Sequence, residues 1–391
     1  MLIDEISAEL EQLRNAKLFR SRNSIEAVNK SRVLVDGNWL LNFSSNDYLG
    51  ISQNKIVKSS IINSIRKYGN GSGASHLLSG HFSPHNTLEI EAAKMIRMEK
   101  SLFFSTGYMA NLAAVGALCN RNSIIFSDKL NHASLNEAAT LSRAKLVRYH
   151  HLDLNHLEKL IKNNLIKRKL IVTDGVFSMD GDIADIPGLV YLCKKYDATL
   201  YIDDAHGYGV LGNSGQGIIE YYEDKGLISK DSREVIIYMF TLGKSIGVSG
   251  ALLCGKREII EYCVQKSKSY IYTTAAAPYI ASGVISSMSL IGKDIKLRKK
   301  LNLLIKLFRS KIINKSALTD SQTAIQPIII NDLKRALSVS SQLRALGFLV
   351  PVIRPPTVPA GTSRLRISIS ALHSKKDIID LTSVINSLLP E

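Results

Sequence analysis

The segment TLYIDDAHGYGVLG, residues 199–212, carries the pattern that decides the fold. TLYID is a short apolar run of the kind that forms a buried strand, and Asp203 and His206 stand where this strand ends. A second segment, FTLGKSIGVSG at residues 240–250, places Lys244 among glycines directly after the apolar run VIIYMF. Glycines allow the backbone to come close to whatever this lysine contacts. Both segments therefore present reactive side chains at the ends of buried strands.

Further short apolar runs alternate with helical stretches between about residues 56 and 270, namely SLFF, SIIF, KLVRY, KLIVTD and GALLC. Connections long enough to be helices join parallel strands, so this alternation predicts an α/β fold. The expected core is a mainly parallel sheet covered by helices on both faces. Sites in such sheets lie at the carboxyl ends of the strands, which is where the motifs fall.

The two ends of the chain have other patterns. Residues 3–18 predict an amphipathic helix, and residues 33–43 predict a strand pair that turns at Asp36 and Gly37. Towards the C-terminus, the runs AIQPIII, FLVPVI and SRLRISIS predict strands. The last of these alternates strictly, which is typical of a half-solvated antiparallel strand.

A helix completes the chain, with Ser374 and Asp377 as a capping pair at its start. The C-terminal part is thus a compact α+β domain beside the larger α/β domain. The domains expected from the sequence are an N-terminal helix and hairpin segment (1–45), a large cofactor-binding domain (46–285) and a small C-terminal domain (286–391).

Composition limits the class of protein. Of the 391 residues, 45% are hydrophobic and 21% are charged, as in ordinary globular proteins. The most apolar stretch, residues 273–292, is interrupted by Pro278 and predicts a buried helix, not a membrane span. The N-terminus is acidic where a signal peptide is basic, so we expect a cytoplasmic protein. The four cysteines form no CxxC pair and predict reduced core thiols.

The formal net charge of +16 would attract nucleic acid, anionic membranes or acidic partners. Basic residues are densest in residues 293–311, where apolar residues recur at helical spacing and predict a surface helix with a solvated basic face. No zinc-finger, helix-turn-helix or aromatic RNA-binding motif accompanies the charge, and no Cys/His cluster has metal-ligand spacing. The sequence therefore predicts no nucleic-acid partner, no membrane association and no metal.

A lysine at one strand end and an Asp-x-x-His at another are residues that a pyridoxal phosphate enzyme uses. The lysine holds the cofactor aldehyde as a Schiff base, and a carboxylate on the pyridinium nitrogen lets the ring accept electrons. Taken singly, Lys244 could be a solvent lysine and Asp203 a hydrogen-bonded core residue. The remaining motifs favour the cofactor site.

Three of these motifs follow predicted strands. FFSTGYMAN leads into a helix whose first amides, beside a glycine, can cradle a phosphate, and Thr241 could add a hydroxyl. SDKLNHAS puts His132 in a polar loop, where it can stack on a flat ring. TDGVFSMDGD offers Asp174 and Ser178 at a strand end. Together these motifs describe a phosphate-bearing aromatic cofactor held at one edge of the sheet.

With these motifs the chain resembles the α-oxoamine synthase family of fold-type I pyridoxal phosphate enzymes. SSNDYLG, the glycine-rich loop GSGASHLLSG, the motifs above and RPPTVPAGTSRLRIS occur in the family's order and at its spacing. The resemblance covers essentially the whole chain. His76 departs from it, because small or basic residues are common at this place in the family, and we assign it no role.

The resemblance implies a role for each matching residue. Lys244 would hold the cofactor, Asp203 would pair with its ring nitrogen, and His206 would lie near its ring hydroxyl. His132 would stack on the ring, as a catalytic residue that also helps to bind and position the substrate. The other implied cofactor contacts are Gly107, Tyr108, Ser178, Thr241 and, from the partner chain of a homodimer, Thr274. The residues implied in binding the acyl substrate and the amino acid carboxylate are Arg20, Thr357 and Arg366, with Arg354 as a neighbour.

The reaction implied by the resemblance is a decarboxylating condensation of L-alanine with a pimeloyl thioester, which makes an early biotin precursor. One alternative is a synthase that joins glycine or serine to another acyl thioester, such as a 2-amino-3-oxobutyrate ligase. Another is a non-catalytic basic binding protein on the same fold, against which the intact catalytic set argues. RPPTVPAGTSRLRIS favours the alanine enzyme. The acyl donor stays open between coenzyme A and an acyl carrier protein.

Overall fold

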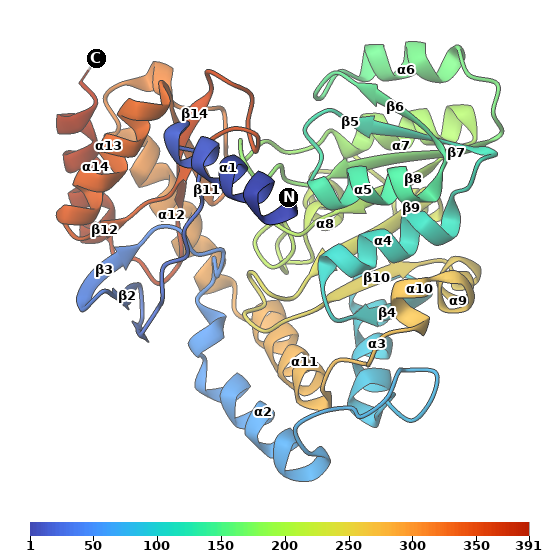
Figure 1. The fold of residues 1–391 in the computed structure, drawn as a ribbon. Coiled ribbons are helices and arrows are strands. Elements are labelled where there is room, and N and C mark those ends of the chain that lie inside the picture. Colours follow the sequence, from blue (N-terminus) through green and yellow to red (C-terminus); the bar gives the residue numbers. More distant parts are fainter. Residues whose placement is uncertain (391) are drawn as a thin grey trace. The chain divides into compact units, whose positions relative to one another are not determined.

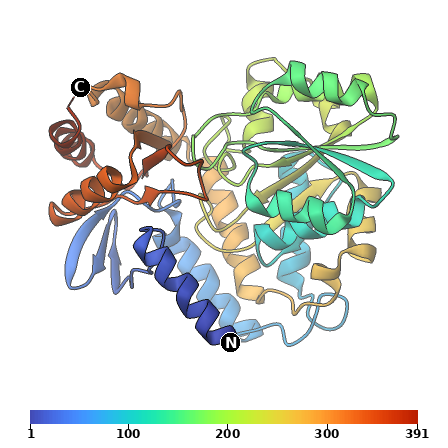
Figure 2. The ribbon, with the colours of Figure 1, turned by 45° about the horizontal axis from the view of Figure 1, so that its top comes forward.

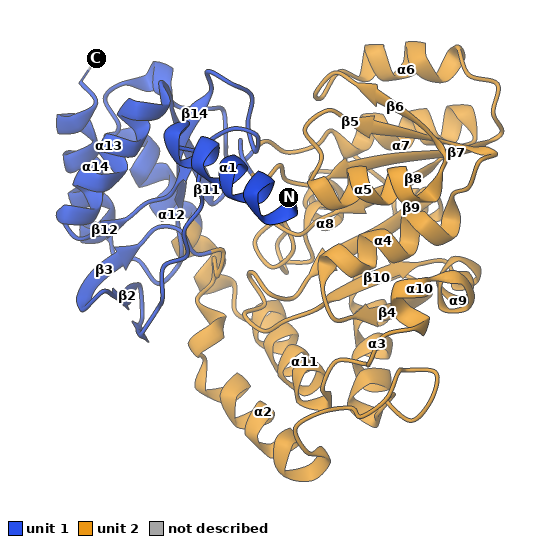
Figure 3. Cartoon of the chain, viewed as in Figure 1, with its two compact units in different colours: residues 1–45, 179–181, 302–391 blue, residues 46–178, 182–301 orange. Residues whose placement is uncertain are grey.

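The computed structural model describes residues 1–390, which form two compact units (Figure 3). Unit 2 comprises residues 46–178 and 182–301. Unit 1 comprises residues 1–45, residues 179–181 and the chain from residue 302 onward. None of the described helices combines the length and hydropathy that a membrane crossing needs.

These units differ from the domains expected from the sequence. The expected N-terminal segment, 1–45, groups with the C-terminal part of the chain. Unit 2 ends at Leu301 and not at residue 285, because helix α11 (Pro278–Lys293) packs against α2 (Lys55–Tyr68) and α3 (Ser83–Ile96). Because of this packing, unit 2 extends beyond the boundary that the sequence pattern predicts.

A seven-stranded sheet forms the centre of unit 2 (Figure 1), in the order β4-β10-β9-β8-β7-β5-β6. Its strands are β4 (Lys100–Phe104), β5 (Ser123–Asp128), β6 (Lys145–Tyr149), β7 (Arg168–Asp174), β8 (Thr199–Asp203), β9 (Ile236–Thr241) and β10 (Ala251–Gly255). Only β10 runs antiparallel to its neighbours, β4 and β9. The connection between β9 and β10 is too short for the crossover that a parallel neighbour needs. The predicted mainly parallel sheet is confirmed.

Helices cover this sheet on both faces, since every residue of β5 and β10 is buried. The remaining helices of unit 2 are α4 (Gly107–Leu118), α5 (Ala133–Ser142), α6 (Leu154–Lys162), α7 (Ile186–Tyr196), α8 (Ile218–Asp224), α9 (Arg257–Lys266) and α10 (Lys268–Ile271), with the 3-10 turns η1 (Ile51–Gln53) and η2 (Lys230–Val235). All strands except β10 end at the same edge, so the loops after β4, β5, β7, β8 and β9 lie together there.

Unit 1 holds two small sheets, β1-β2-β3-β12 and β11-β14-β13. Its strands are β1 (Ala27–Asn29), β2 (Arg32–Val35), β3 (Asn38–Asn42), β11 (Ile325–Asn331), β12 (Phe348–Leu349), β13 (Val352–Ile353) and β14 (Ser363–Ser368). Its helices are α1 (Leu2–Asn15), α13 (Leu333–Ala345) and α14 (Lys375–Leu388), with the turn η3 (Lys315–Ala317); α12 (Ile295–Lys311) crosses from unit 2. The parallel pair β3 and β12 ties the N-terminal segment to the C-terminal part.

Several local predictions for unit 1 are confirmed. The hairpin turns between Val35 and Asn38, and Ser374 and Asp377 form a capping box at the start of α14. Helix α1, the dark-blue helix of Figure 2, ends at Asn15, three residues before the predicted end, and none of its residues is buried. Helix α12 buries its apolar stripe and exposes most of its basic residues, but Arg298 is buried.

Two strand predictions are wrong. FLVPVI is not one strand, because Pro351 has no amide to donate, and β12 and β13 on either side of it join different sheets. Strand β14 is not half-solvated: all six of its residues are buried. It is the central strand of its sheet, and its polar side chains have internal partners. Arg364 pairs with Asp180, and Nη1 of Arg366 donates to Oγ of Ser368 at 2.8 Å.

Candidate active site

A cavity of about 200 Å³ lies in unit 2, where the loops after β4, β5, β7, β8 and β9 meet. Eight of the residues predicted for the site line it: Gly107, Tyr108, His132, Ser178, Asp203, His206, Thr241 and Lys244. They come from five strand ends spread over more than a third of the chain. The structure therefore brings together the residues that the separate motifs identified.

Lys244 and His206 are in direct contact in this cavity. Nζ of Lys244 lies 2.7 Å from Nε2 of His206, and Nδ1 of His206 lies 2.7 Å from the hydroxyl of Tyr48. The Tyr48 hydroxyl donates to Oδ1 of Asn46 at 3.0 Å, so His206 donates to Tyr48 through Nδ1 and accepts from Lys244 through Nε2. A continuous hydrogen-bonded path thus runs from the lysine amine to Asn46.

The loop after β9 holds Lys244 in place. The amide of Gly247 donates to the carbonyl of Lys244 at 2.9 Å, which closes a tight turn. Gly247 has φ of +71°, and a Cβ there would lie 2.4 Å from the backbone nitrogen of Ser52. Only glycine meets both demands, so the sequence GKSIG sets the position from which the lysine side chain extends.

Asp203, at the end of β8, has both carboxylate oxygens engaged. Oδ2 accepts from Nδ2 of Asn111 at 2.8 Å, and Oδ1 accepts from the amide of Ala205 at 3.1 Å. Asn111 is itself held by Tyr201, whose hydroxyl donates to Oδ1 of Asn111 at 2.8 Å. Since Asp203 is only 5% exposed, these donors fix the carboxylate in one orientation at the wall of the cavity.

His132 is held by the same network. Its Nδ1 lies 2.7 Å from Oγ of Ser134, which also accepts from Nδ2 of Asn111. Its backbone amide donates to Oδ2 of Asp174 at 3.1 Å. Burial lowers the pKa of His132, and the charge of Lys244 lowers it further, while Asp203 acts in the opposite direction. The ring is therefore neutral at neutral pH and can lie against an aromatic cofactor.

Asp174 lies beside Asp203 in neighbouring strands of the sheet. Burial raises the pKa of Asp174 well above its ordinary value, and the nearby Asp203 carboxylate raises it further. Two adjacent carboxylates resist being ionised together in such surroundings. The surroundings of Asp174 therefore favour its protonated form.

The start of α4 has the geometry that the predicted phosphate cradle needs. Thr106 caps the helix, since its Oγ1 accepts from the amide of Met109 at 3.1 Å. A Cβ on Gly107 would lie 2.5 Å from Cγ2 of Thr241, so glycine is required for this close approach. Helix amides and a threonine hydroxyl are thereby placed at one end of the cavity, an arrangement suited to an anion.

Thr274 does not line the cavity of its own chain. It is exposed and pairs with Ser75 in an isolated β-bridge. Its contact with the phosphate in a partner chain stays a prediction.

The predicted substrate residues lie in unit 1, so their grouping with the cavity also stays a prediction. Nη2 of Arg20 lies 3.5 Å from Oγ1 of Thr357. Arg366 is buried in β14, and Nη2 of Arg354 donates to the carbonyl of Phe19.

Sequence reasoning missed Asn111, Ser134 and Tyr48. Asn111 stands four residues after Gly107 on α4, on the same helix face, and this spacing was the available signal. Ser134 follows His132 by two residues. Tyr48 belongs to SSNDYLG, which matched the family without indicating a partner for the tyrosine.

His151 joins two loops of the site. Its Nδ1 lies 2.9 Å from Oδ1 of Asp128, and its Nε2 lies 3.1 Å from Oδ2 of Asp182. Asp128 begins the loop that carries His132, and Asp182 follows the loop that carries Ser178. Burial opposes protonation of His151, but the two carboxylates outweigh it and raise its pKa to about 9. His151 is therefore charged at neutral pH and links the two loops through its carboxylate partners.

Comparison with known proteins decides the family. The family model for aminotransferase class I and II matches residues 39–385. The chain is 45% identical over 390 residues to an 8-amino-7-oxononanoate synthase of Nitrosomonas eutropha, and the match covers 99% of both chains. It is 45% identical over 388 residues to one of Methylobacillus flagellatus, covering 99% of this chain and 96% of the relative.

The chain belongs to the 8-amino-7-oxononanoate synthase family. Solved structures agree. A serine palmitoyltransferase from S. paucimobilis with bound PLP-myriocin superposes with a TM-score of 0.89 at 26% identity, covering 98% of this chain and 96% of that one. An 8-amino-7-oxononanoate synthase from Francisella tularensis superposes with a TM-score of 0.77 at 31% identity, covering 89% and 97%. The resemblance drawn from the motifs and the predicted fold class are both confirmed.

Proposed function

We propose that this chain is a pyridoxal-phosphate-dependent acyltransferase that condenses L-alanine with a pimeloyl thioester, with loss of carbon dioxide, to give 8-amino-7-oxononanoate for biotin. The family to which the chain belongs supports this reaction. The observation that carries it is the 2.7 Å contact between Lys244 and His206 in a cavity that Asp203 also lines. A lysine, a histidine and a carboxylate so placed are the groups that the chemistry requires.

The residues of the cavity fit pyridoxal phosphate. The first amides of α4, with Gly107 and Thr241, would hold the phosphate. The Asp203 carboxylate would pair with the ring nitrogen, and the Lys244 amine would bind the aldehyde. When bound, the cofactor supplies an electron sink for the negative charge that develops at the substrate Cα.

Lys244 would take the Cα proton of alanine. A lysine amine acts as a base only when it is neutral, so it needs a place to send its own proton. His206 offers one at 2.7 Å, and Tyr48 stabilises the imidazole from the other side. His132, neutral and anchored by Ser134 and Asp174, would restrict how the cofactor ring and the substrate can move.

Unit 1 would supply the substrate contacts. Arg366 would bind the alanine carboxylate through its planar guanidinium, a geometry suited to a carboxylate. Arg20 and Thr357, which lie within 3.5 Å of each other, would meet the acyl substrate. These assignments rest on the family resemblance.

The working form that we propose is a cytoplasmic homodimer in which Thr274 of one chain reaches the phosphate of the other. The exposure of Thr274 supports this arrangement. All four cysteines are free and buried, which suits a reducing compartment. The charge of +16 would also favour docking of an acidic acyl carrier protein as the pimeloyl donor.

The deciding experiment compares donors and amino acids. Steady-state rates with alanine, glycine and serine are measured against pimeloyl-CoA, a pimeloyl carrier protein and acetyl-CoA, with product identified by mass. We expect alanine with a pimeloyl donor to give the highest kcat/KM. Faster turnover of glycine with acetyl-CoA would assign a 2-amino-3-oxobutyrate ligase instead. A rate with the carrier protein that does not fall with added salt would contradict electrostatic docking.

A further inference from the structure

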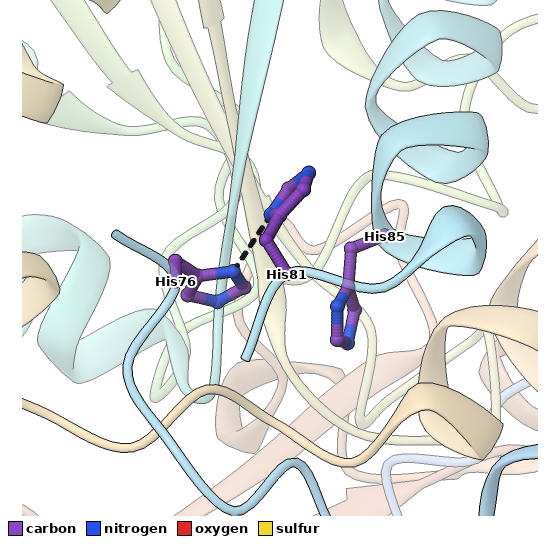
Figure 4. Close-up of side chains that lie close together, drawn as sticks. All are labelled: His76, His81 and His85. Carbon is purple, nitrogen blue, oxygen red and sulfur yellow. Dashed lines mark hydrogen bonds between the residues drawn. The ribbon is translucent and has the colours of Figure 1, made fainter. Parts of the chain in front are cut away.

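Three histidines of unit 2 lie together, and none of them lines the catalytic cavity (Figure 4). His76 and His81 come from the loop before α3, and His85 comes from the first turn of α3. One ring nitrogen from each lies within 4.8 Å of those of the other two. Nδ1 of His76 and Nδ1 of His81 are 2.9 Å apart. The dashed line in Figure 4 marks this contact, which the two rings make across the loop.

We propose that this cluster binds a divalent transition metal ion of the zinc type, with His76, His81 and His85 as its ligands. Imidazole nitrogen is a preferred ligand of such ions. Two nitrogens on a tetrahedral zinc ion lie about 3.3 Å apart, given zinc–nitrogen bonds of about 2.0–2.1 Å. The observed spacing of 2.9 Å between two Nδ1 atoms is that of a hydrogen bond. The ion would replace the shared proton, which moves to Nε2 of the same ring, and the two nitrogens would then separate slightly. A water would complete the coordination.

Imidazole binds a metal through the lone pair of an unprotonated ring nitrogen. In the contact between Nδ1 of His76 and Nδ1 of His81 one nitrogen donates and the other accepts, so one of the two rings already presents a lone pair there. Nδ1 of His85 accepts from the amide of Phe82, so this nitrogen also carries a lone pair.

Glu89 stands behind His81 as a supporting group. Its Oε2 lies 4.0 Å from Nε2 of His81, the nitrogen that would face away from the metal. Metal-binding histidines commonly turn their second nitrogen towards a carboxylate, which orients the ring. The amide of Phe103 holds the other oxygen at 2.9 Å, so the carboxylate is already oriented.

Binding requires two hydrogen bonds of the cluster to open, the one between His76 and His81 and one at His85. Nδ1 of His85 accepts from the amide of Phe82 at 3.0 Å, which places the ring proton on Nε2. The buried Nε2 faces the carbonyl groups of Ala276 and Ala277 without reaching hydrogen-bond geometry. At His85 one neutral hydrogen bond must therefore open to free a lone pair, and between His76 and His81 the ion takes the place of the shared proton. In return the metal adds a new bond to each ring.

The alternative is that the three rings only pack. His76 stacks on Tyr270 with ring centroids 4.8 Å apart, and His85 lies over Phe103 at 5.8 Å.

A second histidine group, at His150 and His156, provides a control for the zinc titration. His156 there accepts from the amide of His150 at 3.0 Å, and His150 is exposed.

The test uses the cofactor-loaded protein without a histidine tag. The protein is stripped with a chelator, and Zn²⁺ is then titrated in competition with a chromophoric chelator. We expect one zinc ion per chain. His81→Ala, chosen because this ring is the most exposed of the three, should weaken binding by at least about 100-fold. Glu89→Gln should weaken it by about 10–100-fold, as loss of a supporting carboxylate does. His150→Ala should leave it unchanged.

Circular dichroism and thermal melting verify that each variant is folded. His76→Gln provides a second ligand variant if His81→Ala does not fold, and it should give the same loss. Co²⁺ in place of Zn²⁺ should produce the visible band of a tetrahedral nitrogen site in the wild type and not in His81→Ala. The proposal is overturned if the wild type binds no zinc, or if zinc affinity is the same in the folded ligand variants.

Discussion

The catalytic histidines and the cluster of His76, His81 and His85 differ in how the fold assembles them. His132 and His206 follow different strands of the sheet, and each bonds a side chain from another element, His132 that of Asp174 and His206 that of Tyr48. The cluster lies within ten consecutive residues, and its three histidine rings contact one another. A strand end marks a site in the sequence, whereas a cluster within one loop is visible only once that loop is folded.

The largest expected effect comes from removing Lys244, the reactive lysine of the catalytic site. Lys244→Ala should lower kcat by at least about 10⁴-fold, because both the bond to the cofactor and the base are lost. Melting should be nearly unchanged, since this side chain is only partly buried. Initial rates of product formation measure the effect. Lys266→Ala, at the exposed end of α9, is the matched control and should keep full activity.

Asp203→Asn sharpens the comparison by keeping the shape of the network and removing its charge. We expect exchange of the alanine Cα hydrogen with deuterated solvent to slow by about 10²-fold or more, because the ring nitrogen would lose the anion that keeps it protonated. Proton NMR of alanine follows the exchange. Asp153→Asn, which preserves the cap of α6, is the control. Exchange at the wild-type rate would rule out the role given to Asp203.

Tyr48→Phe asks whether His206 needs its outer partner. The variant loses the 2.7 Å contact with Nδ1, and kcat should fall by about 10-fold. The pH profile of kcat/KM should shift, which a merely structural loss would not cause. Tyr196→Phe serves as the control. It also removes a tyrosine hydroxyl, which donates to Glu158 in a partly buried contact. An unchanged profile would remove Tyr48 from the proton path.

His151→Gln should have the smallest effect, and it acts on stability. The pKa of about 9 in the folded protein lies above the unfolded value of about 6.5, so protonated His151 stabilises the fold. That contribution is complete below pH 6.5 and is lost as pH rises through about 9. Discounted for solvent screening, it amounts to about 1 kcal/mol. Urea unfolding at pH 6 and pH 10 should therefore show a difference between variant and wild type that shrinks with pH.

Much of the large domain was predictable because each buried strand of a parallel sheet is a short apolar run with a reactive residue after it. β8 and Asp203 are examples. The C-terminal strands were less predictable. The alternation in β14 matched a half-solvated strand, but its arginines are buried. Arg364 pairs with Asp180, which is distant in sequence, and Arg366 donates to Ser368, a contact that the strand pattern does not indicate.

The site was predicted to the level of which residues meet, and not of how they are held. Nothing near Asn111 in the sequence shows that its amide joins Asp203 to Ser134, because those partners lie on other elements. His76 was assigned no role because it departs from the family pattern. Its contact with His81, five residues further on, appears only in the folded loop, which brings the two Nδ1 atoms to 2.9 Å.

The central claim is that Lys244 holds the cofactor in the cavity where Asp203 and His206 lie. The most direct measurement is borohydride reduction of the cofactor-loaded protein, followed by peptide mapping by mass spectrometry. We predict that the visible absorption band disappears and that the pyridoxyl group is found on the peptide containing Lys244. A pyridoxyl group on any other lysine, or on none, would contradict the account.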